Sequence, residues 1–294
     1  MLKILLPVDF SECSDAAVTY ALTLAAAEPG AHLLLLHCFQ DYLTEGNSLE
    51  PETSLSSTEV VTEQVLHRNE TEAQQQLDEL YNSILLKTRA AGQKLVLERA
   101  FMYGLPEEVI PAQLKGYNPT LVVMGTKGEP NLARSLFGTI VTHVLKEITV
   151  PVLTVPRMYQ GAAFRNVLYA TDFDKTDTEA IETLAELLQP FNASIICIHI
   201  SDGTIPADSE KLAALRKKLQ HAGYASNIQF RLLEGDDVAE ALLELVNREN
   251  INLVALTTRE RNLLDSILHP SLANKLVLEA NVPLLIFHSK QKPA

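Results

Sequence analysis

The sequence lacks the long apolar run that a membrane-spanning helix requires. None of its 294 residues lies in a stretch that approaches about 20 uncharged apolar residues. The opening MLKILLPVDF reaches an aspartate before the apolar core of a signal peptide could form. We therefore expect a cytoplasmic protein with no membrane partner.

Cysteine is scarce as well. The three cysteines, Cys13, Cys38 and Cys197, are too few and too scattered for a disulfide framework or a zinc site, both of which need paired spacings. We expect reduced, buried thiols and no metal site.

Basic residues are outnumbered by acidic ones. The chain has 24 Lys and Arg against 37 Asp and Glu, a formal net charge of −13. Binding to nucleic acid without regard to sequence, or to anionic lipid, depends on clustered Lys and Arg that neutralise phosphates. The composition argues against a nucleic-acid partner and favours a small ligand or a protein partner.

The chain repeats itself, and its length is about twice that of a domain of ~100–200 residues. Leu121–Pro156 aligns without a gap on Leu253–His288, with nine identical positions. The opening strand and its Asp-Phe ending, Lys3–Phe10, has a counterpart in Asn166–Phe173. We predict two domains, residues 1–157 and 164–294.

Each half reads as short Val/Leu/Ile-rich strands that alternate with helical runs. Continuous apolar strands are typical of a parallel sheet with helices on both faces. We predict an α/β architecture of two tandem, open, Rossmann-like parallel-sheet domains that form a pseudo-dimer. The first half carries about thirty extra residues at roughly 40–90, where we expect an acidic loop followed by a longer helix.

One loop has the pattern of a phosphate-binding segment. The stretch MGTKGEPNLARSLFGTI places Gly125, Gly128 and Gly138 after an apolar strand, with Thr139 next to the last glycine. Glycine allows close backbone approach, and a helix N-terminus offers free N–H groups to phosphate. The loop is not a Walker A motif, and the G-x-G-x-x-G fingerprint is missing.

The spacing G-x2-G-x9-G-[ST] resembles the ATP-binding signature of the universal stress protein family. The resemblance extends to the opening PVDFS and to the strand VPVLTVP, and it covers nearly the whole chain twice. It implies an adenine nucleotide alpha hydrolase-like fold and a bound adenine nucleotide, ATP with or without Mg²⁺, in a stress-response or regulatory protein.

The resemblance also implies a set of nucleotide-binding residues at the ends of the strands. Those after the first two strands would hold the base and the adenosine end, the next two would line the ribose, and the last four would line the phosphates. The predicted ATP-binding set is Pro7, Val8, Asp9, Cys38, Met124, Gly125, Gly128, Gly138, Thr139 and Ile140.

The second half departs from this pattern at all three glycines, which are replaced by Thr257, Glu260 and Pro270. A carboxylate at Glu260 would repel phosphate, and Pro270 has no N–H to donate. We expect nucleotide in the first half only.

Two of the candidate features have structural interpretations. Asp9 can act as a helix cap or a loop carboxylate, since Ser11 and Ser14 lie beside it. His37 and His199 end buried strands, where a histidine is more often a satisfied core residue than a metal ligand.

The sequence leaves the activity open. Lys127, Glu129 and Arg134 lie in the loop, but their spacing specifies no role in ATP hydrolysis, so we predict no catalytic residues. The alternatives to a binding module are a slow ATP hydrolase or nucleotidyl-handling enzyme, and a ligand-free interaction protein that uses the acidic insert. A homodimer is left open as well.

Overall fold

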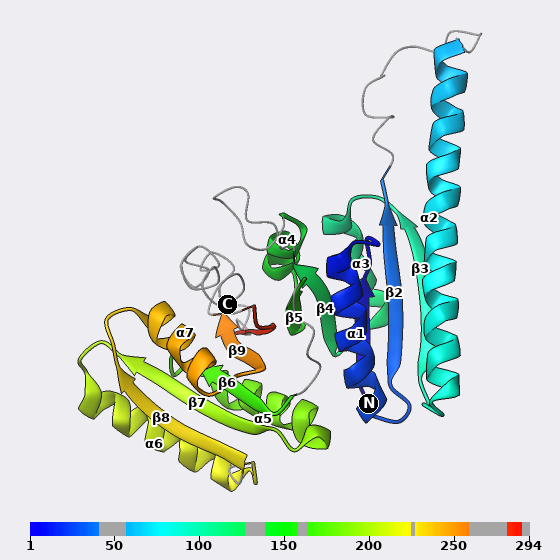
Figure 1. Ribbon diagram of the computed structural model, residues 1–294. Helices are drawn as coiled ribbons and strands as arrows, with labels where there is room; N and C mark the ends of the chain where they lie inside the picture. The colour runs from blue at the N-terminus through cyan, green and yellow to red at the C-terminus, as the bar shows by residue number, and fades with distance from the viewer. Residues whose placement is uncertain (41–56, 127–138, 158–163, 225–226, 259–280, 290–294) are drawn as a thin grey trace.

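The computed structural model describes residues 1–40, 57–126, 139–157, 164–224, 227–258 and 281–289 (Figure 1). The described part of the first half contains β1 (Lys3–Pro7), α1 (Glu12–Ala27), β2 (His32–Phe39), α2 (Ser57–Ala90), β3 (Val96–Tyr103), α3 (Pro106–Tyr117), β4 (Leu121–Thr126), α4 (Thr139–Glu147) and β5 (Val152–Pro156). That of the second contains β6 (Asn166–Ala170), α5 (Asp177–Leu188), the 3-10 helix η1 (Gln189–Phe191), β7 (Ser194–Ser201), α6 (Ile205–His221), β8 (Ile228–Glu234), α7 (Val238–Arg248), β9 (Leu253–Thr258) and β10 (Leu284–His288).

The strands of both halves belong to one sheet. Its order is β3-β2-β1-β4-β5-β10-β9-β6-β7-β8, so the second half repeats the strand order of the first. Strands within a half pair in parallel, whereas β5 and β10 pair antiparallel with Leu153 opposite Leu285. The prediction of two tandem parallel-sheet domains is confirmed, and the two halves meet edge to edge as a pseudo-dimer.

Helices cover both faces of the sheet. Buried residues of α1, α2, α5 and α6 form one hydrophobic cluster with the strands, and buried residues of α3, α4 and α7 form the other. The strands are apolar on both faces for this reason: Leu33 and Leu35 of β2 belong to the first cluster, and Leu34 and Leu36 to the second. The α/β fold is therefore doubly wound.

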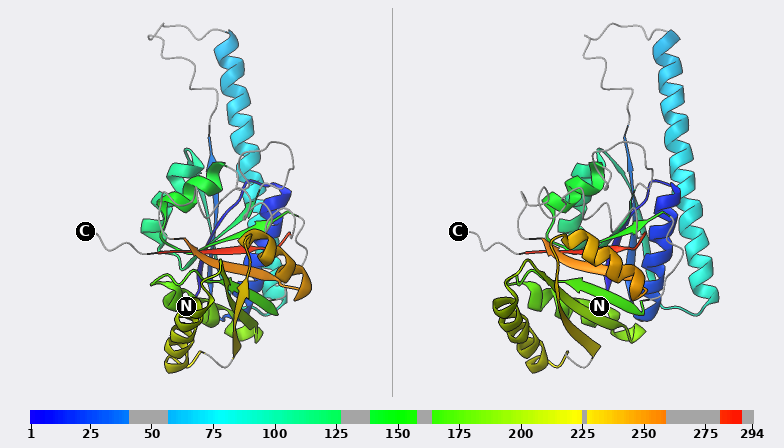
Figure 2. Two further views of the ribbon diagram at one scale, coloured as in Figure 1. Left: turned by 90° about the vertical axis from the view of Figure 1, so that its left-hand side faces the viewer. Right: turned by 60° about the vertical axis from the view of Figure 1, so that its left-hand side comes forward.

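The insert of the first half contains α2, a helix of 34 residues that rises well beyond the sheet (Figures 1 and 2). Its C-terminal part is held by Leu77 and Ile84, which are buried against β3 and its neighbours. Arg99 of β3 adds an ion pair with Asp78, at 2.7 Å between Nε and Oδ1. Of the acidic loop predicted at 41–64, residues 41–56 lie outside the described residues, whereas residues 57–64 form the start of α2, so the helix begins earlier than predicted.

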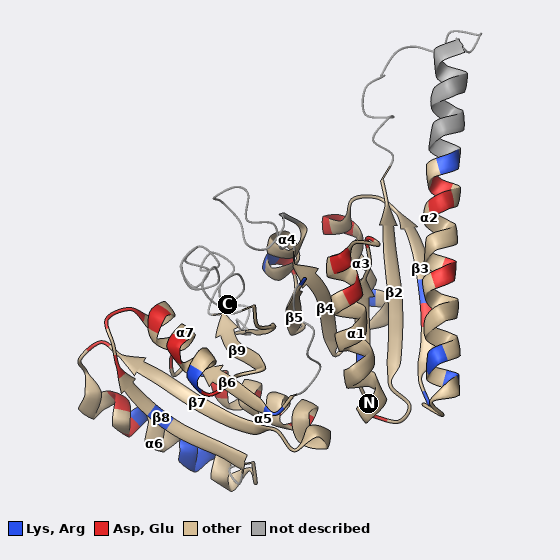
Figure 3. Ribbon diagram, viewed as in Figure 1, with Lys and Arg blue, Asp and Glu red and all other residues tan. Residues whose placement is uncertain are grey.

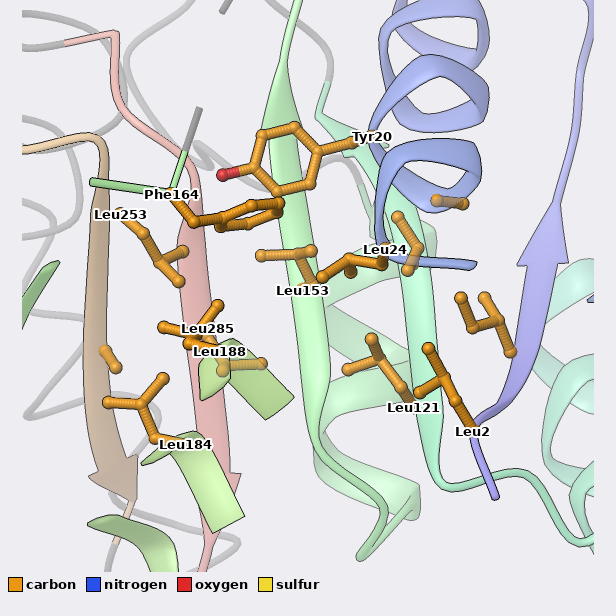
Figure 4. Packing of buried hydrophobic residues seen from close by; sticks show 14 of the residues in the cluster. Leu2, Tyr20, Leu24, Leu121, Leu153, Phe164, Leu184, Leu188, Leu253 and Leu285 are labelled. Carbon is orange, nitrogen blue, oxygen red and sulfur yellow. The ribbon is translucent and has the colours of Figure 1, made fainter. Parts of the chain in front are cut away.

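The two halves also share a hydrophobic core. Phe164, at the entry to the second half, packs edge-on against Tyr20 of α1, with ring centroids 4.8 Å apart (Figure 4). On its other side it contacts Phe191, at 4.6 Å. Tyr20, Phe164, Leu153 and Leu285 belong to one cluster that spans both halves, so the halves share a core at their junction.

In the part of the chain that the structure describes, no helix combines the length and the apolar character needed to cross a membrane.

Candidate functional site

A cavity of about 340 Å³ opens where β1, β2 and β4 end. Ligands of open parallel sheets bind at this carboxyl edge, where loops diverge. The structure brings seven of the ten predicted residues to its wall: Pro7, Val8, Asp9, Cys38, Met124, Gly125 and Ile140. The wall is completed by Ser11, Cys13, Ser14, Leu36, Pro106, Ile110 and Val141.

Three of the ten predicted residues are not among the wall residues of this cavity. Gly128 and Gly138 lie outside the described residues. Thr139 is the first residue of α4, although its side chain is not described. The helix nevertheless begins at the cavity, because the next two residues, Ile140 and Val141, line it.

Asp9 is held at the start of α1 by two serines. Its Oδ1 accepts from the N–H and the hydroxyl of Ser11, at 3.1 and 2.6 Å, and from the hydroxyl of Ser14. Partial burial acts to raise the pKa of Asp9, but these hydrogen bonds outweigh it and lower the pKa below its usual value. The side chain is thus a fixed, ionised acceptor, which suits ligand N–H or O–H groups and repels phosphate.

Cys38 presents a neutral thiol to the cavity. Burial, with the negative charge of Glu107 as a second cause, raises its pKa to about 11. Glu107 belongs to the acidic first turn of α3, which is red in Figure 3. Since nucleophiles and metal ligands need the thiolate, Cys38 contributes shape and backbone groups at neutral pH.

Gly125 has a packing role that the sequence did not show. A Cβ at this position would lie 2.3 Å from the carbonyl oxygen of Cys13, in the first turn of α1. The close approach is therefore between β4 and the backbone of α1. It brings the end of β4 against the start of α1, which forms one wall of the cavity.

The residues missed by the sequence analysis come mainly from helix starts. Ser11 is the N-cap of α1, and Pro106 opens α3 directly after the β3 loop. Both have the local signature of a helix start that follows a strand. That signature could have found them, whereas Ile110 and Leu36 line the cavity only because of how the layers pack.

In the second half, the matching position is filled by a buried polar network. By the repeat, Thr257 matches Gly125, and Asp177 matches Ser14. Asp177 is 1% exposed, and its carboxylate accepts from Tyr169 at 2.8 Å and from Thr171 at 2.5 Å. The hydroxyl oxygens of Tyr169 and Thr257 lie 2.7 Å apart.

The network shifts the pKa of Asp177 in the direction opposite to the shift of Asp9. Burial raises the pKa of Asp177, and the hydrogen bonds from Thr171 and Tyr169 offset this only in part. Asp177 is buried among hydroxyl groups of its own half, whereas Asp172, which matches Asp9 in the repeat, is exposed as Asp9 is. Thr257 and Asp177 are thus linked through Tyr169 where, in the first half, Gly125 and the backbone of Cys13 are in close contact.

The two strand-end histidines are satisfied by the backbone. Nδ1 of His37 lies 2.8 Å from the carbonyl oxygen of Val8, and Nδ1 of His199 lies 2.8 Å from that of Thr171. Each ring also packs on the phenylalanine of the Asp-Phe turn, Phe10 or Phe173, which adopts a positive φ. Among the described residues, no group of three or more His, Cys, Asp or Glu could hold a metal ion.

These features define a tandem α/β protein in which two copies of one five-stranded parallel unit share a sheet, and in which the first copy keeps a ligand-sized cavity at its carboxyl edge. The chain belongs to the universal stress protein family, whose model matches residues 1–156 and again 163–288.

Solved structures support the fold. A universal stress protein from Archaeoglobus fulgidus DSM 4304 has a TM-score of 0.72 and 22% identity, covering 97% of this chain and 98% of its own. A functionally unknown protein from Pseudomonas aeruginosa PAO1 has a TM-score of 0.60 at 13% identity, covering 97% and 92%. The cytoplasmic domain of a prokaryotic cation chloride cotransporter has a TM-score of 0.54 at 12% identity, covering 97% and 94%. No curated protein matches the sequence.

Proposed function

We propose that the chain is a cytoplasmic regulatory module of the stress response that holds one adenine nucleotide, ATP with or without Mg²⁺, in its first half. The observation that carries this proposal is the cavity of about 340 Å³ at the carboxyl edge, around which seven of the ten residues implied by the family resemblance converge. A partner protein would read whether the nucleotide is bound.

The polarity of the cavity suits a nucleotide in one orientation. Asp9 offers a negative acceptor at one side, which favours the hydroxyl and amino groups of an adenosine. The first turn of α4 lies at another part of the wall, where free N–H groups and the helix dipole favour phosphate. Apolar residues such as Val8, Ile110 and Met124 provide the surface that a base needs.

The restriction to the first half rests on the network of the second. Tyr169, Asp177 and Thr257 occupy the region beside the first helix of that half. Opening it would leave a buried carboxylate without its donors, which costs free energy. We therefore propose that the second half serves packing or the recognition of another molecule.

Retention of the nucleotide without efficient turnover is part of the proposal. The ionisable groups on the described wall are Asp9, Cys13 and Cys38. Oδ1 of Asp9 is occupied by serine donors, and the Cys38 thiol is neutral. Neither Asp9 nor Cys38 is arranged to activate water beside a terminal phosphate.

The test is calorimetric titration of Mg-ATP into the intact chain and into the variant Ile140→Glu. Ile140 is 39% exposed and lines the cavity, so the new carboxylate should oppose the phosphates without unfolding the protein. We expect one site, and a loss of affinity of about tenfold or more in the variant.

The matched control is Val238→Glu, at a similarly exposed apolar residue in the first turn of α7. It should bind like the unaltered chain. Binding that is absent from the unaltered chain, or unchanged in Ile140→Glu, would overturn the proposal. Steady release of phosphate at a substantial rate would favour the hydrolase instead.

A further inference from the structure

A second cavity, of about 430 Å³, opens in the second half at the amino ends of its strands. It lies where β7 and β8 begin and where α5 and α6 end, and four strands of the sheet separate β7 from β4 at the first cavity. Its described wall is formed by Ala185, Glu186, Leu188, Gln189, Asn192, Ala193, Ile195, Gly223, Tyr224, Asn227 and Ile228.

The inner part of this cavity is apolar. Four of its wall residues belong to the hydrophobic core and are nearly inaccessible to solvent: Leu188, Ala193, Ile195 and Ile228. The floor of the cavity is therefore the edge of the core, and the apolar surface that a ligand can reach comes from Ala185 and the Tyr224 ring, which are partly exposed. Its volume lies within the range of about 300–1,000 Å³ that is typical of small-molecule sites.

The polar part of the wall carries negative charge. Glu186 of α5 is the one acidic side chain among the described wall residues. Tyr224 donates its hydroxyl to Oε1 of Glu186, at 2.5 Å. This bond, with the nearby charges of Glu186 and Glu182, raises the pKa of Tyr224, so the phenol stays neutral. The carboxylate is thus held beside an aromatic ring, an arrangement that attracts cations.

The ends of two helices add to the negative potential at the wall. Both α5 and α6 end at the cavity, and the carboxyl end of a helix carries a partial negative charge. Lys218 and His221 lie in the last turn of α6, but neither is among the wall residues. No lysine or arginine belongs to the described wall, so the wall favours a cation and disfavours a carboxylate or phosphate ligand.

We propose that this cavity is a second binding site, for a small organic ammonium ion with an apolar body. The ammonium group lies at the Glu186 carboxylate and the Tyr224 ring, and the apolar body lies against Ala185, above the core residues Ile195 and Ile228. The amide side chains of Gln189, Asn192 and Asn227 line the remaining wall.

The test compares three probes of similar shape that differ in charge: 2-phenylethylammonium, 2-phenylethanol and 3-phenylpropanoate. Each is titrated into the full chain and followed by calorimetry and by NMR of the protein. We expect saturable binding of the ammonium ion, at least tenfold weaker binding of the alcohol, and none of the carboxylate. Equal binding of the ammonium ion and the alcohol would overturn the proposal, as would a failure of the ammonium ion to saturate.

Three variants locate the site. Glu186→Gln keeps the shape of the side chain and removes its charge, so ammonium binding should fall at least tenfold. Glu210→Gln, an exposed residue of α6 outside the wall, should leave it unchanged. Ala185→Leu narrows the cavity from α5 and should abolish binding while the thermal midpoint shows a folded chain. Unchanged binding in Glu186→Gln or Ala185→Leu would exclude this cavity.

Mg-ATP binding separates this inference from the proposed function. The two cavities lie in different halves and several strands apart in the sheet, so Glu186→Gln should leave the nucleotide affinity of the unaltered chain as it is. A parallel loss of nucleotide and ammonium binding in that variant would indicate a general structural defect and would overturn the assignment.

Discussion

At the scale of single residues, one repeated position separates the two halves. In the first half, Gly125 lets β4 approach the backbone of Cys13, and the space beside it remains open as the cavity. In the second half, Thr257 supplies a hydroxyl group to the network of Tyr169 and Asp177. A glycine at this position therefore accompanies close contact between strand and helix, and a threonine accompanies a hydrogen-bonded side-chain network.

The substitution Gly125→Ala should destabilise the protein by about 1–3 kcal/mol, because its Cβ would meet the carbonyl oxygen of Cys13 at 2.3 Å. Urea denaturation would measure the change. The control is Gly116→Ala in α3, where a Cβ meets nothing within 4 Å. Its stability should stay constant or rise by up to about 1 kcal/mol, since alanine favours a helix. Equal stability of both variants would show that the β4 contact with α1 is not tight.

At the scale of elements, α2 divides into an anchored part and a part that projects. Leu77 and Ile84 fix its C-terminal part on the sheet, with Leu80 and Tyr81 partly buried beside them. Leu86, on the same helix, is 69% exposed. Among the residues of α2 whose side chains are described, the apolar contacts with the core thus form one stripe on the side that faces the sheet.

Leu77→Ala should lower the free energy of unfolding by about 2–5 kcal/mol, since it leaves a cavity in the core. Leu86→Ala, the same change on the exposed side of the same helix, should alter it by no more than about 0.5 kcal/mol. Denaturation followed by circular dichroism would compare them. Similar losses in the two variants would mean that α2 is not anchored through Leu77.

At the scale of the whole molecule, the two halves form a single structure. The antiparallel pairing of β5 with β10 makes the sheet continuous, and the hydroxyl of Thr154 donates across it to the carbonyl of Leu284 at 3.2 Å. Phe164 fills the junction between Tyr20 and Phe191. Unfolding one half would therefore expose the core surface of the other.

We expect one cooperative transition in calorimetry for the unaltered chain. Phe164→Ala should lower the stability of both halves together, by about 3–5 kcal/mol, because the ring packs on residues from each. Two separate transitions in the unaltered chain, of which Phe164→Ala shifts only one, would instead indicate that the halves fold independently.

Much of the architecture could be predicted because it depends on local properties of the chain. The spacing of apolar residues predicts the alternation of strands and helices, and the match of Lys3–Phe10 with Asn166–Phe173 predicts the repeat. The ends of β1, β2 and β4 follow from these strands. Residues such as Asp9 and Cys38 were therefore predicted at an edge where the structure has a cavity.

By itself, the sequence determined the two-part α/β fold and the family, since periodicity and glycine spacing are read along the chain. Only the tertiary structure decided the contacts between distant residues: Gly125 against Cys13, and Leu153 opposite Leu285. The closed network around Asp177 and the cavity beside Glu186 likewise arise where separate elements meet. Their geometry depends on how the layers pack, and no local pattern encodes it.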